Sequence, residues 1–296
     1  MPGQQSPTAK AAVISTNTTI RVRSDLVLIP VTVTDKSGKP VSGLEKEQFT
    51  LFEDDTQQEI THFAAEDAPA SIAILFDASD SMTPKVRKAR EAVGALLNSI
   101  NPDSELSLIR FSTRAQVLVP LTSHLDEIRD AAYNIRIAGA TALLDAVRLG
   151  MQQLAEARYT RKAIIIISDG EDNASHWTVN ELKTSVREQD VVIYSIAIAE
   201  SMGSYAELQQ MMGAALLKDI SSQSGGCMYP LTRLQDLPQI GYKIGSRLRN
   251  QYVLGYVPTR PAMDGTYRKV ELRITRPKGF PKLQAAWRRG YLAPKE

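Results

Sequence analysis

Residues 72–81 read IAILFDASDS, five apolar side chains followed by a turn with Asp77, Ser79 and Ser81 at alternate positions. An apolar run without alternation is typical of a strand that helices cover on both faces. In open parallel sheets, ligands bind outside the carboxyl ends of the strands. The DxSxS turn therefore lies where a binding site is expected, and its extended form can direct one carboxylate and two hydroxyls to a single point.

Three more segments repeat the pattern of a buried strand, and amphipathic stretches separate them. Apolar side chains recur at helical spacing over residues 86–100 and 144–154. Strands that alternate with helices predict an α/β fold: a doubly wound, mostly parallel, Rossmann-like sheet with helices on both faces. We expect this domain to occupy residues 67–249, and its further strands are predicted at residues 106–112, 163–168 and 191–199.

Both ends of the chain change to the period of two that half-buried strands show. Residues 18–66 alternate apolar and polar side chains between turns, and residues 250–293 return to the same pattern. Neither end has enough strands to be stable alone, so we expect both to combine into one small β-sandwich. Two independent β appendages are the alternative. Residues 1–17 are predicted to be a flexible arm, and the C-terminal strands are predicted at residues 252–257, 269–276 and 283–291.

Two further segments can reach the same edge of the sheet as the DxSxS turn. Thr141 precedes a predicted helix, and Asp169 follows the third apolar strand. With Asp77, Ser79 and Ser81 they form a set of oxygen donors, which Mg²⁺, Mn²⁺ and then Ca²⁺ suit better than zinc or copper. Each piece alone is typical of a helix N-cap or a turn. Their succession at the ends of predicted parallel strands predicts a metal site.

Composition narrows the classes of function. The chain has 296 residues, one cysteine and three histidines, which exclude an intramolecular disulfide and a CxxC motif and leave little for a zinc site. The net charge of +2 gives no general attraction to nucleic acid or an anionic membrane. This total hides a division, because residues 241–296 hold 13 Lys and Arg against 3 Asp and Glu. We interpret that basic run as a solvated strand face, with contact to an anionic surface as the alternative.

Signals for membrane insertion and export are missing from the sequence. Apolar runs such as residues 163–167 are far shorter than the roughly 20 residues that span a bilayer. The first residues, MPGQQSPTAKAA, contain no apolar leader core. We therefore expect no membrane span. A location outside the cytoplasm, in the periplasm, at the cell surface or secreted, is expected if a leader was removed, and a cytoplasmic one otherwise.

At these residues the chain resembles the von Willebrand factor type A domain family, over residues 67–246. The resemblance is carried by the motif of the metal-ion-dependent adhesion site, with DxSxS at residues 77–81, then GATAL and SDGED. The flanking segments resemble those of bacterial proteins related to this family, notably acidobacterial ones, which are commonly exported. The resemblance implies a divalent cation bound, in part through water, by Asp77, Ser79, Ser81, Thr141 and Asp169.

From these observations we expect a non-enzymatic module for protein–protein recognition or adhesion. The cation would keep an open coordination position, which an Asp or Glu carboxylate of a protein partner would fill. We expect the surrounding partner surface to include Met82, Ala140, Glu171 and Trp177, since aromatic residues dominate interface hot spots. We expect no nucleic acid among the partners, and a monomeric protein.

Two other functions fit part of the sequence. A structural protein of the cell envelope could use the same metal only to stabilise its fold. A Mg²⁺-dependent phosphotransferase of the haloacid dehalogenase type would also place an aspartate after its first strand, as Asp77 is placed here. That chemistry needs a second carboxylic acid two residues later as general acid and base. Ser79 occupies that position, so the proton shuttle is missing.

Overall fold

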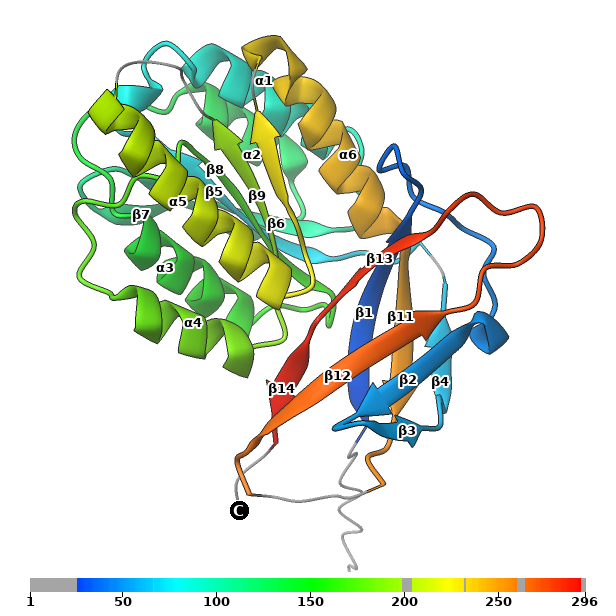
Figure 1. Ribbon diagram of the computed structural model, residues 1–296. Coiled ribbons are helices and arrows are strands. Elements are labelled where there is room, and N and C mark those ends of the chain that lie inside the picture. Colours follow the sequence, from blue (N-terminus) through cyan, green and yellow to red (C-terminus); the bar gives the residue numbers. More distant parts are fainter. Residues whose placement is uncertain (1–25, 66, 199–203, 232, 260–263, 294–296) are drawn as a thin grey trace, which may run out of the picture.

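The computed structural model describes residues 26–65, 67–198, 204–231, 233–259 and 264–293. These residues form an α/β domain and a smaller unit of two antiparallel sheets, which we call the β platform (Figure 1). The β platform combines the first strands of the chain with the last ones, so the α/β domain lies between its two parts in sequence. The predicted arm at residues 1–17 lies outside the described residues.

The α/β domain is built on a six-stranded sheet in the order β10-β9-β8-β5-β6-β7. Neighbouring strands run parallel except for β7, which pairs antiparallel with β6 at one edge. The predicted strands are found to within about two residues of their expected ends. The strands are β5 (Ser71–Asp77), β6 (Glu105–Phe111), β7 (Ala115–Thr122), β8 (Lys162–Ser168), β9 (Val192–Ile198) and β10 (Met228–Leu231).

Three helices cover each face of this sheet, which confirms the predicted fold class. On β5, Ile72, Ile74 and Phe76 pack under one group of helices, while Ala73 and Leu75 pack under the other. Both faces are buried because successive strand side chains point to opposite sides. One face carries α1 (Val86–Leu97), α2 (Leu125–Tyr133) and α6 (Leu237–Arg249), and the other carries α3 (Leu143–Ala155), α4 (Val179–Glu188) and α5 (Ser204–Gln223).

The β platform joins the two ends of the described chain, as the sequence predicts. Its sheets have the orders β13-β1-β11-β4 and β14-β12-β2-β3, and a shared apolar core including Val31, Leu51 and Leu254 lies between them. The N-terminal strands are β1 (Val27–Thr34), β2 (Phe49–Glu53), β3 (Thr56–Gln58) and β4 (His62–Ala64); the C-terminal ones are β11 (Gln251–Tyr256), β12 (Tyr267–Ile274), β13 (Gln284–Trp287) and β14 (Gly290–Leu292). Short 3₁₀ helices span Lys46–Gln48, Asp80–Met82 and Leu234–Asp236.

One predicted strand of the β platform is wrong. Residues 283–291 form two strands rather than one: β13 pairs with β1 in one sheet, and β14 pairs with β12 in the other. The chain changes sheets at Arg288 and Arg289, between the two strands. We call this change of direction the platform corner. Apolar side chains alternate over Leu283, Ala285 and Trp287, and Arg289 with Gly290 interrupts this pattern at the corner.

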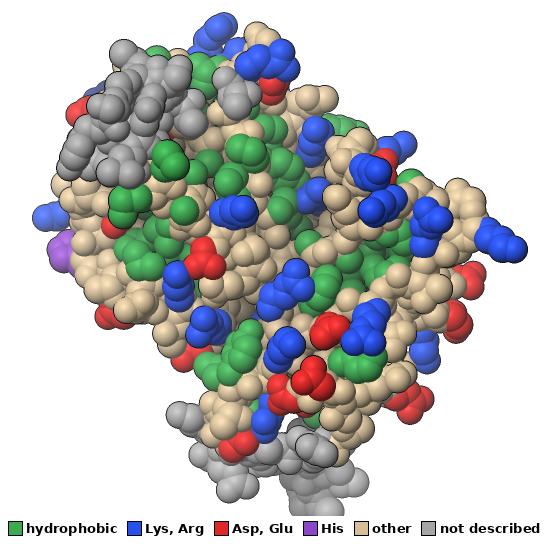
Figure 2. Space-filling view, in the orientation of Figure 1, with side chains coloured by type: hydrophobic (Ala, Val, Ile, Leu, Met, Phe, Trp, Pro, Cys, Tyr) green, Lys and Arg blue, Asp and Glu red, His purple; other side chains and the backbone are tan. Residues whose placement is uncertain are grey.

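The platform corner connects the β platform to the α/β domain. The Arg288 side chain is 8% exposed; it forms an ion pair with Asp190 and donates to the backbone oxygen of Arg187 at the end of α4. Arg268 of β12 pairs with Asp54 and Asp264. The prediction of a solvated basic face is therefore wrong for these two arginines. Figure 2 shows the molecule from the same side as Figure 1. Lys and Arg side chains lie across the middle of this view, with Asp and Glu side chains among them.

None of the helices that the structure describes is both long enough and apolar enough to cross a bilayer.

Candidate functional site

The candidate metal site lies at the carboxyl edge of the central sheet, where three segments meet. β5 and β8 are parallel neighbours with Phe76 opposite Ile167, so Asp77 and the segment after Ile167 emerge at the same edge. The backbone of the turn after β5 bonds to the segment before α3: Ala138 N–H donates to the carbonyl of Ala78 at 2.9 Å. Strand order and backbone hydrogen bonds thus bring together three segments that are far apart in the sequence.

Asp77 is a fully buried carboxylate held by hydroxyl and amide donors. Its Oδ1 accepts from the backbone N–H of Ser79 at 2.9 Å and from Ser79 Oγ at 2.6 Å. Its Oδ2 accepts from Ser168 Oγ at 2.6 Å. Burial, and next the negative charge of Asp169, raise the pKa of Asp77 to about 6. Both causes disfavour the charged carboxylate, and a cation beside Asp77 would favour that charged form.

Asp169 presents an unbonded oxygen inside the site. The residue is 2% exposed, and its Oδ2 lies 3.2 Å from the Nζ of Lys85. Its Oδ1 is buried and makes no hydrogen bond to any residue that the structure describes. A buried carboxylate oxygen without a partner is costly. A bound cation would satisfy it, so the donor set of the site fits a metal ion.

The remaining candidate ligands are the hydroxyl groups of Ser79, Ser81 and Thr141. Ser79 Oγ and Ser81 Oγ are 3.1 Å apart, close enough to share one cation or one hydrogen bond. Thr141 is buried, its N–H donates to Asn173 Oδ1 at 2.8 Å, and its carbonyl accepts from Asn173 N–H at 2.9 Å. Among the described residues, no group of three or more His, Cys, Asp and Glu side chains could hold a metal. A metal here therefore depends on the hydroxyls.

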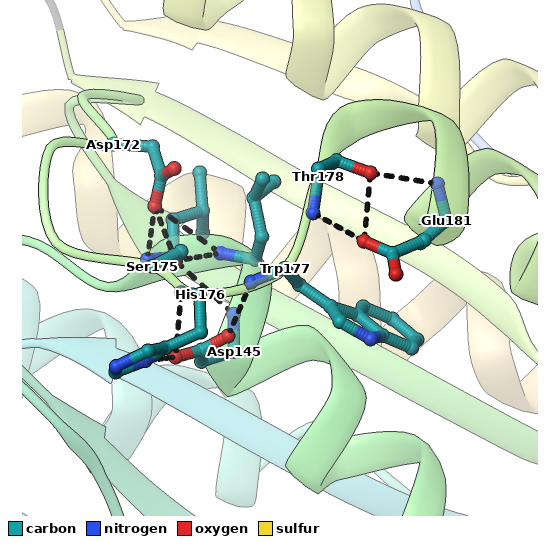
Figure 3. Close-up of polar contacts among 9 residues, drawn as sticks. Asp145, Asp172, Ser175, His176, Trp177, Thr178 and Glu181 are labelled. Carbon is teal, nitrogen blue, oxygen red and sulfur yellow. Dashed lines mark hydrogen bonds and ion pairs between the residues drawn. The ribbon is translucent and has the colours of Figure 1, made fainter.

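The segment after β8 is anchored to the start of helix α3. We call residues 168–174 the metal loop. Asp172 Oδ1 accepts from the N–H of Leu143 at 2.9 Å and from Ser175 Oγ at 2.6 Å, while Ser175 Oγ accepts from the N–H of Leu144 at 3.0 Å (Figure 3). These bonds satisfy N–H groups that a helix start leaves unpaired. Asp172 and Ser175 thus cap the start of α3.

Asp145 of α3 anchors the next part of the same segment. Its Oδ1 accepts from the N–H of Trp177 at 3.0 Å, and its Oδ2 lies 3.1 Å from the N–H and 3.0 Å from the Nδ1 of His176 (Figure 3). Thr178 and Glu181 then form a capping box that begins α4. Glu181 three residues after Thr178 is the sequence signature of this cap.

The residues predicted to contact a partner differ in their exposure. Ala140 is partly exposed, and so is Glu171, whose pKa is raised first by burial and then by the charge of Asp169. Trp177 is half-buried, since its ring packs on the core below and stacks with Arg148 at 5.3 Å. Met82 is fully buried, so its prediction as an exposed contact is wrong. The 3₁₀ turn Asp80–Met82 sends its side chain into the core, while Ser81 remains partly exposed.

Three residues of the site were missed by the sequence prediction. Ser168 holds Asp77, Lys85 pairs with Asp169, and Asp145 holds the segment beyond the metal loop. Ser168 directly precedes Asp169 at the end of a predicted strand, which was a usable signal. A lysine is usually exposed, so the sequence gives no sign that Lys85 is buried.

Two pockets border these regions. The larger, about 690 Å³, lies between the α/β domain and the β platform and is lined by Lys162 and Val192, the first residues of β8 and β9, and by Arg288. It opens at the edge of the sheet opposite the carboxylates. A second pocket of about 500 Å³ borders the metal loop itself and is lined by Glu171, Met212 and others.

Comparisons with known proteins agree with the fold of the α/β domain. A sequence model of the family described as "von Willebrand factor type A domain" matches residues 71–243. The chain is 27% identical to inter-alpha-trypsin inhibitor heavy chain H4 of Bos taurus over 143 residues, 43% of this chain and 16% of that protein. It is 24% identical to calcium-activated chloride channel regulator 1 of Bos taurus over 70% of this chain and 25% of the relative.

Solved structures share the architecture at low sequence identity. A von Willebrand factor type A protein from Catenulispora acidiphila aligns with 90% of this chain and 73% of its own, with a TM-score of 0.52 and 12% identity. Proximal thread matrix protein 1 from the mussel byssus, described with a zinc-occupied MIDAS motif, covers 65% of this chain and 48% of its own, with a TM-score of 0.51 and 20% identity. The chain spans about a sixth of the curated heavy-chain relatives.

Proposed function

Because the chain belongs to the von Willebrand factor type A domain family, we propose that it is a non-enzymatic, metal-dependent module for protein recognition. The domain at residues 67–249 would carry the metal site, and the flanking segments 18–66 and 250–293 would support it as the β platform. The cation would be held by Asp77, Ser79, Ser81, Thr141 and Asp169.

One observation carries this proposal: the buried Oδ1 of Asp169 has no hydrogen-bond partner among the described residues. It belongs to the same cluster as Asp77 and the paired hydroxyls of Ser79 and Ser81. Two carboxylates and neutral hydroxyls suit a hard dication. We propose Mg²⁺ as the resident ion, with Mn²⁺ and Ca²⁺ as substitutes. The mussel byssus relative, described with zinc in its MIDAS motif, supports the binding of a divalent metal in this fold.

The partner would bind by completing the coordination of the metal. Two ligand carboxylates and three hydroxyls leave the cation electrophilic, and an Asp or Glu carboxylate is the side chain that such an ion prefers as a further ligand. Around it, Ala140, Glu171 and Trp177 lie on the loops beside the site and would contact the partner. We propose that the protein acts as a monomer, outside the cytoplasm.

Metal binding is tested by calorimetry with Mn²⁺ and Mg²⁺ on the full chain. We expect the wild type to bind one equivalent, and Asp77→Ala to lose binding because half of the carboxylate charge is removed. The matched control is Asp126→Ala, whose side chain on α2 is 88% exposed. Equal binding by the wild type and Asp77→Ala would falsify the site.

Partner recognition is tested separately with a library of immobilised peptides that contain Asp or Glu, each paired with its Asn or Gln counterpart. Carboxylate peptides should be retained in Mn²⁺ and released by chelator, and the amide counterparts should not be retained. The competing function, a structural role for the metal, predicts a fall in melting temperature on chelation with no metal-dependent peptide retained. Retention that persists in chelator would also contradict the recognition role.

A further inference from the structure

Lys85 is a buried lysine at the edge of the candidate metal site. Its side chain is 1% exposed, and its Nζ lies 3.2 Å from Asp169 Oδ2. Its backbone N–H donates to the carbonyl of Met82 at 2.9 Å, which fixes it as the residue before α1. Lysine is almost never fully buried unless it is paired. The turn after β5 therefore holds an ammonium group within the site.

The two oxygens of the Asp169 carboxylate have different surroundings. Oδ2 faces the ammonium of Lys85, whereas Oδ1 is buried and makes no hydrogen bond within the described part of the chain. Rotation of the carboxylate would break the ion pair inside a region shielded from water, where such a loss is costly. Lys85 thus orients Asp169 so that Oδ1 remains available to a cation.

The balance of charge decides how Lys85 affects a bound dication. Asp77 and Asp169 are both buried and interact unfavourably with each other, and Glu171 interacts with Asp169 and Lys85. Lys85 supplies a positive charge at this cluster and offsets part of the negative charge that attracts a metal. Interactions between charges are strong where water is excluded. A dication that enters beside an ammonium is therefore bound more weakly than by the same ligands alone.

We propose that Lys85 is the internal counter-ion of the metal site: it positions Asp169, stabilises the metal-free form and weakens the binding of divalent cations. A site of this kind keeps its shape when the metal leaves. This inference rests on the proposed function, because it takes Asp77 and Asp169 to be cation ligands.

The test compares Lys85→Met with the wild type in the full-length chain. Methionine keeps an unbranched side chain and removes the charge. We expect Lys85→Met to bind Mn²⁺ at least about tenfold more tightly in calorimetry. In chelator its melting temperature should fall below that of the wild type, and saturating Mn²⁺ should raise it by more than in the wild type.

The matched control is Leu96→Ala, which removes a buried side chain from α1 without changing charge. It should lower the melting temperature with and without metal and leave the Mn²⁺ affinity within about twofold. Unchanged or weaker Mn²⁺ binding by Lys85→Met overturns the inference. If the wild type itself binds no Mn²⁺, the proposed function has failed instead, and the two failures are distinguishable.

A second pair of variants tests the counter-ion if Lys85→Met does not fold. Asp169→Asn removes the carboxylate charge that faces the Lys85 ammonium, whereas Asp77→Asn leaves the Lys85–Asp169 pair intact. In chelator, Asp169→Asn should therefore have a lower urea midpoint than Asp77→Asn. Equal midpoints, or the reverse order, contradict the role of Lys85.

Discussion

Gly213 of α5 and Gly170 of the metal loop lie backbone against backbone, so that a Cβ atom on Gly213 would overlap the carbonyl oxygen of Gly170. Gly170 also has a φ of +86°, which L side chains rarely adopt. Asp169 directly precedes Gly170 in the chain. The position of α5 is therefore transmitted to a proposed metal ligand through two residues that lack side chains.

We expect Gly213→Ala to weaken Mn²⁺ binding by about 10–100-fold, the usual effect of disturbing groups that support a metal ligand. The added methyl group must push the metal loop away from α5. Calorimetry measures the affinity. Gly94→Ala is the control, because this glycine of α1 has nothing within 4 Å of an added Cβ. It should keep the affinity and gain roughly 0.5–1 kcal/mol of stability. Wild-type affinity in Gly213→Ala would exclude this coupling.

Asp145 should make the segment at residues 175–178 sensitive to acid. Burial raises the pKa of its carboxyl, but bonds from His176 and Trp177 outweigh burial and bring the pKa below its ordinary value of 3.8. A lowered pKa in the folded state means that the stabilisation is complete above 3.8 and is lost as pH falls through the folded-state pKa. Fluorescence of Trp177, in a Trp287→Phe background, should report release of the segment in that acid range.

Asp145→Asn provides the comparison for this titration. The amide cannot ionise, so its Trp177 fluorescence should lack the acid step and resemble the released state already at pH 7. An acid step of equal size in Asp145→Asn would assign the transition to another group.

Met82→Ala should destabilise the protein by about 2–5 kcal/mol, as expected for the loss of a fully buried side chain. Met211→Ala is the exposed counterpart, because Met211 is 69% exposed. It should change stability by no more than about 0.5 kcal/mol. Urea denaturation measures both. Equal effects of the two substitutions would mean that Met82 is not in the core.

Arg288→Ala should lower stability by about 1–3 kcal/mol, because it removes a nearly buried guanidinium that bonds to Asp190 and to the Arg187 backbone. Arg273→Ala, at a side chain that is 66% exposed, is the control and should stay within about 0.5 kcal/mol. Hydrogen exchange should also show faster exchange near the end of α4 in Arg288→Ala alone. Unchanged exchange there would argue against the platform corner as the connection.

The sequence predicts the central sheet well because its signal is local. An apolar run such as residues 72–76 specifies a strand buried on both faces, and the order of strands then brings Asp77 and Asp169 to one edge. The same reasoning finds the segments that hold Thr141 and the serines. It needs only periodicity and the rule that parallel strands end together.

What the sequence cannot predict depends on contacts between distant residues. Lys85 is buried because Asp169, 84 positions later, supplies its counter-charge. Met82 is buried because the 3₁₀ turn that begins at the exposed Asp80 directs the Met82 side chain into the core. The break at Arg288 follows from the ion pair with Asp190 and from the pairing of β14 with β12. In each case the residue type suggests one environment and a tertiary contact imposes another.

The pairing of the two chain ends also dictates the order in which the molecule can fold during synthesis. In β1, Val27 pairs with Tyr256 and Val31 with Trp287, so its partners leave the ribosome more than 200 residues later. At typical rates of translation this delay is on the order of tens of seconds. The central strands β5 to β9 end at Ile198, well before β11 begins at Gln251, so this part of the α/β domain can collapse first. Strand β1 lacks both neighbouring strands of its sheet until then, and its apolar side chains are fully covered only when β11 and β13 arrive.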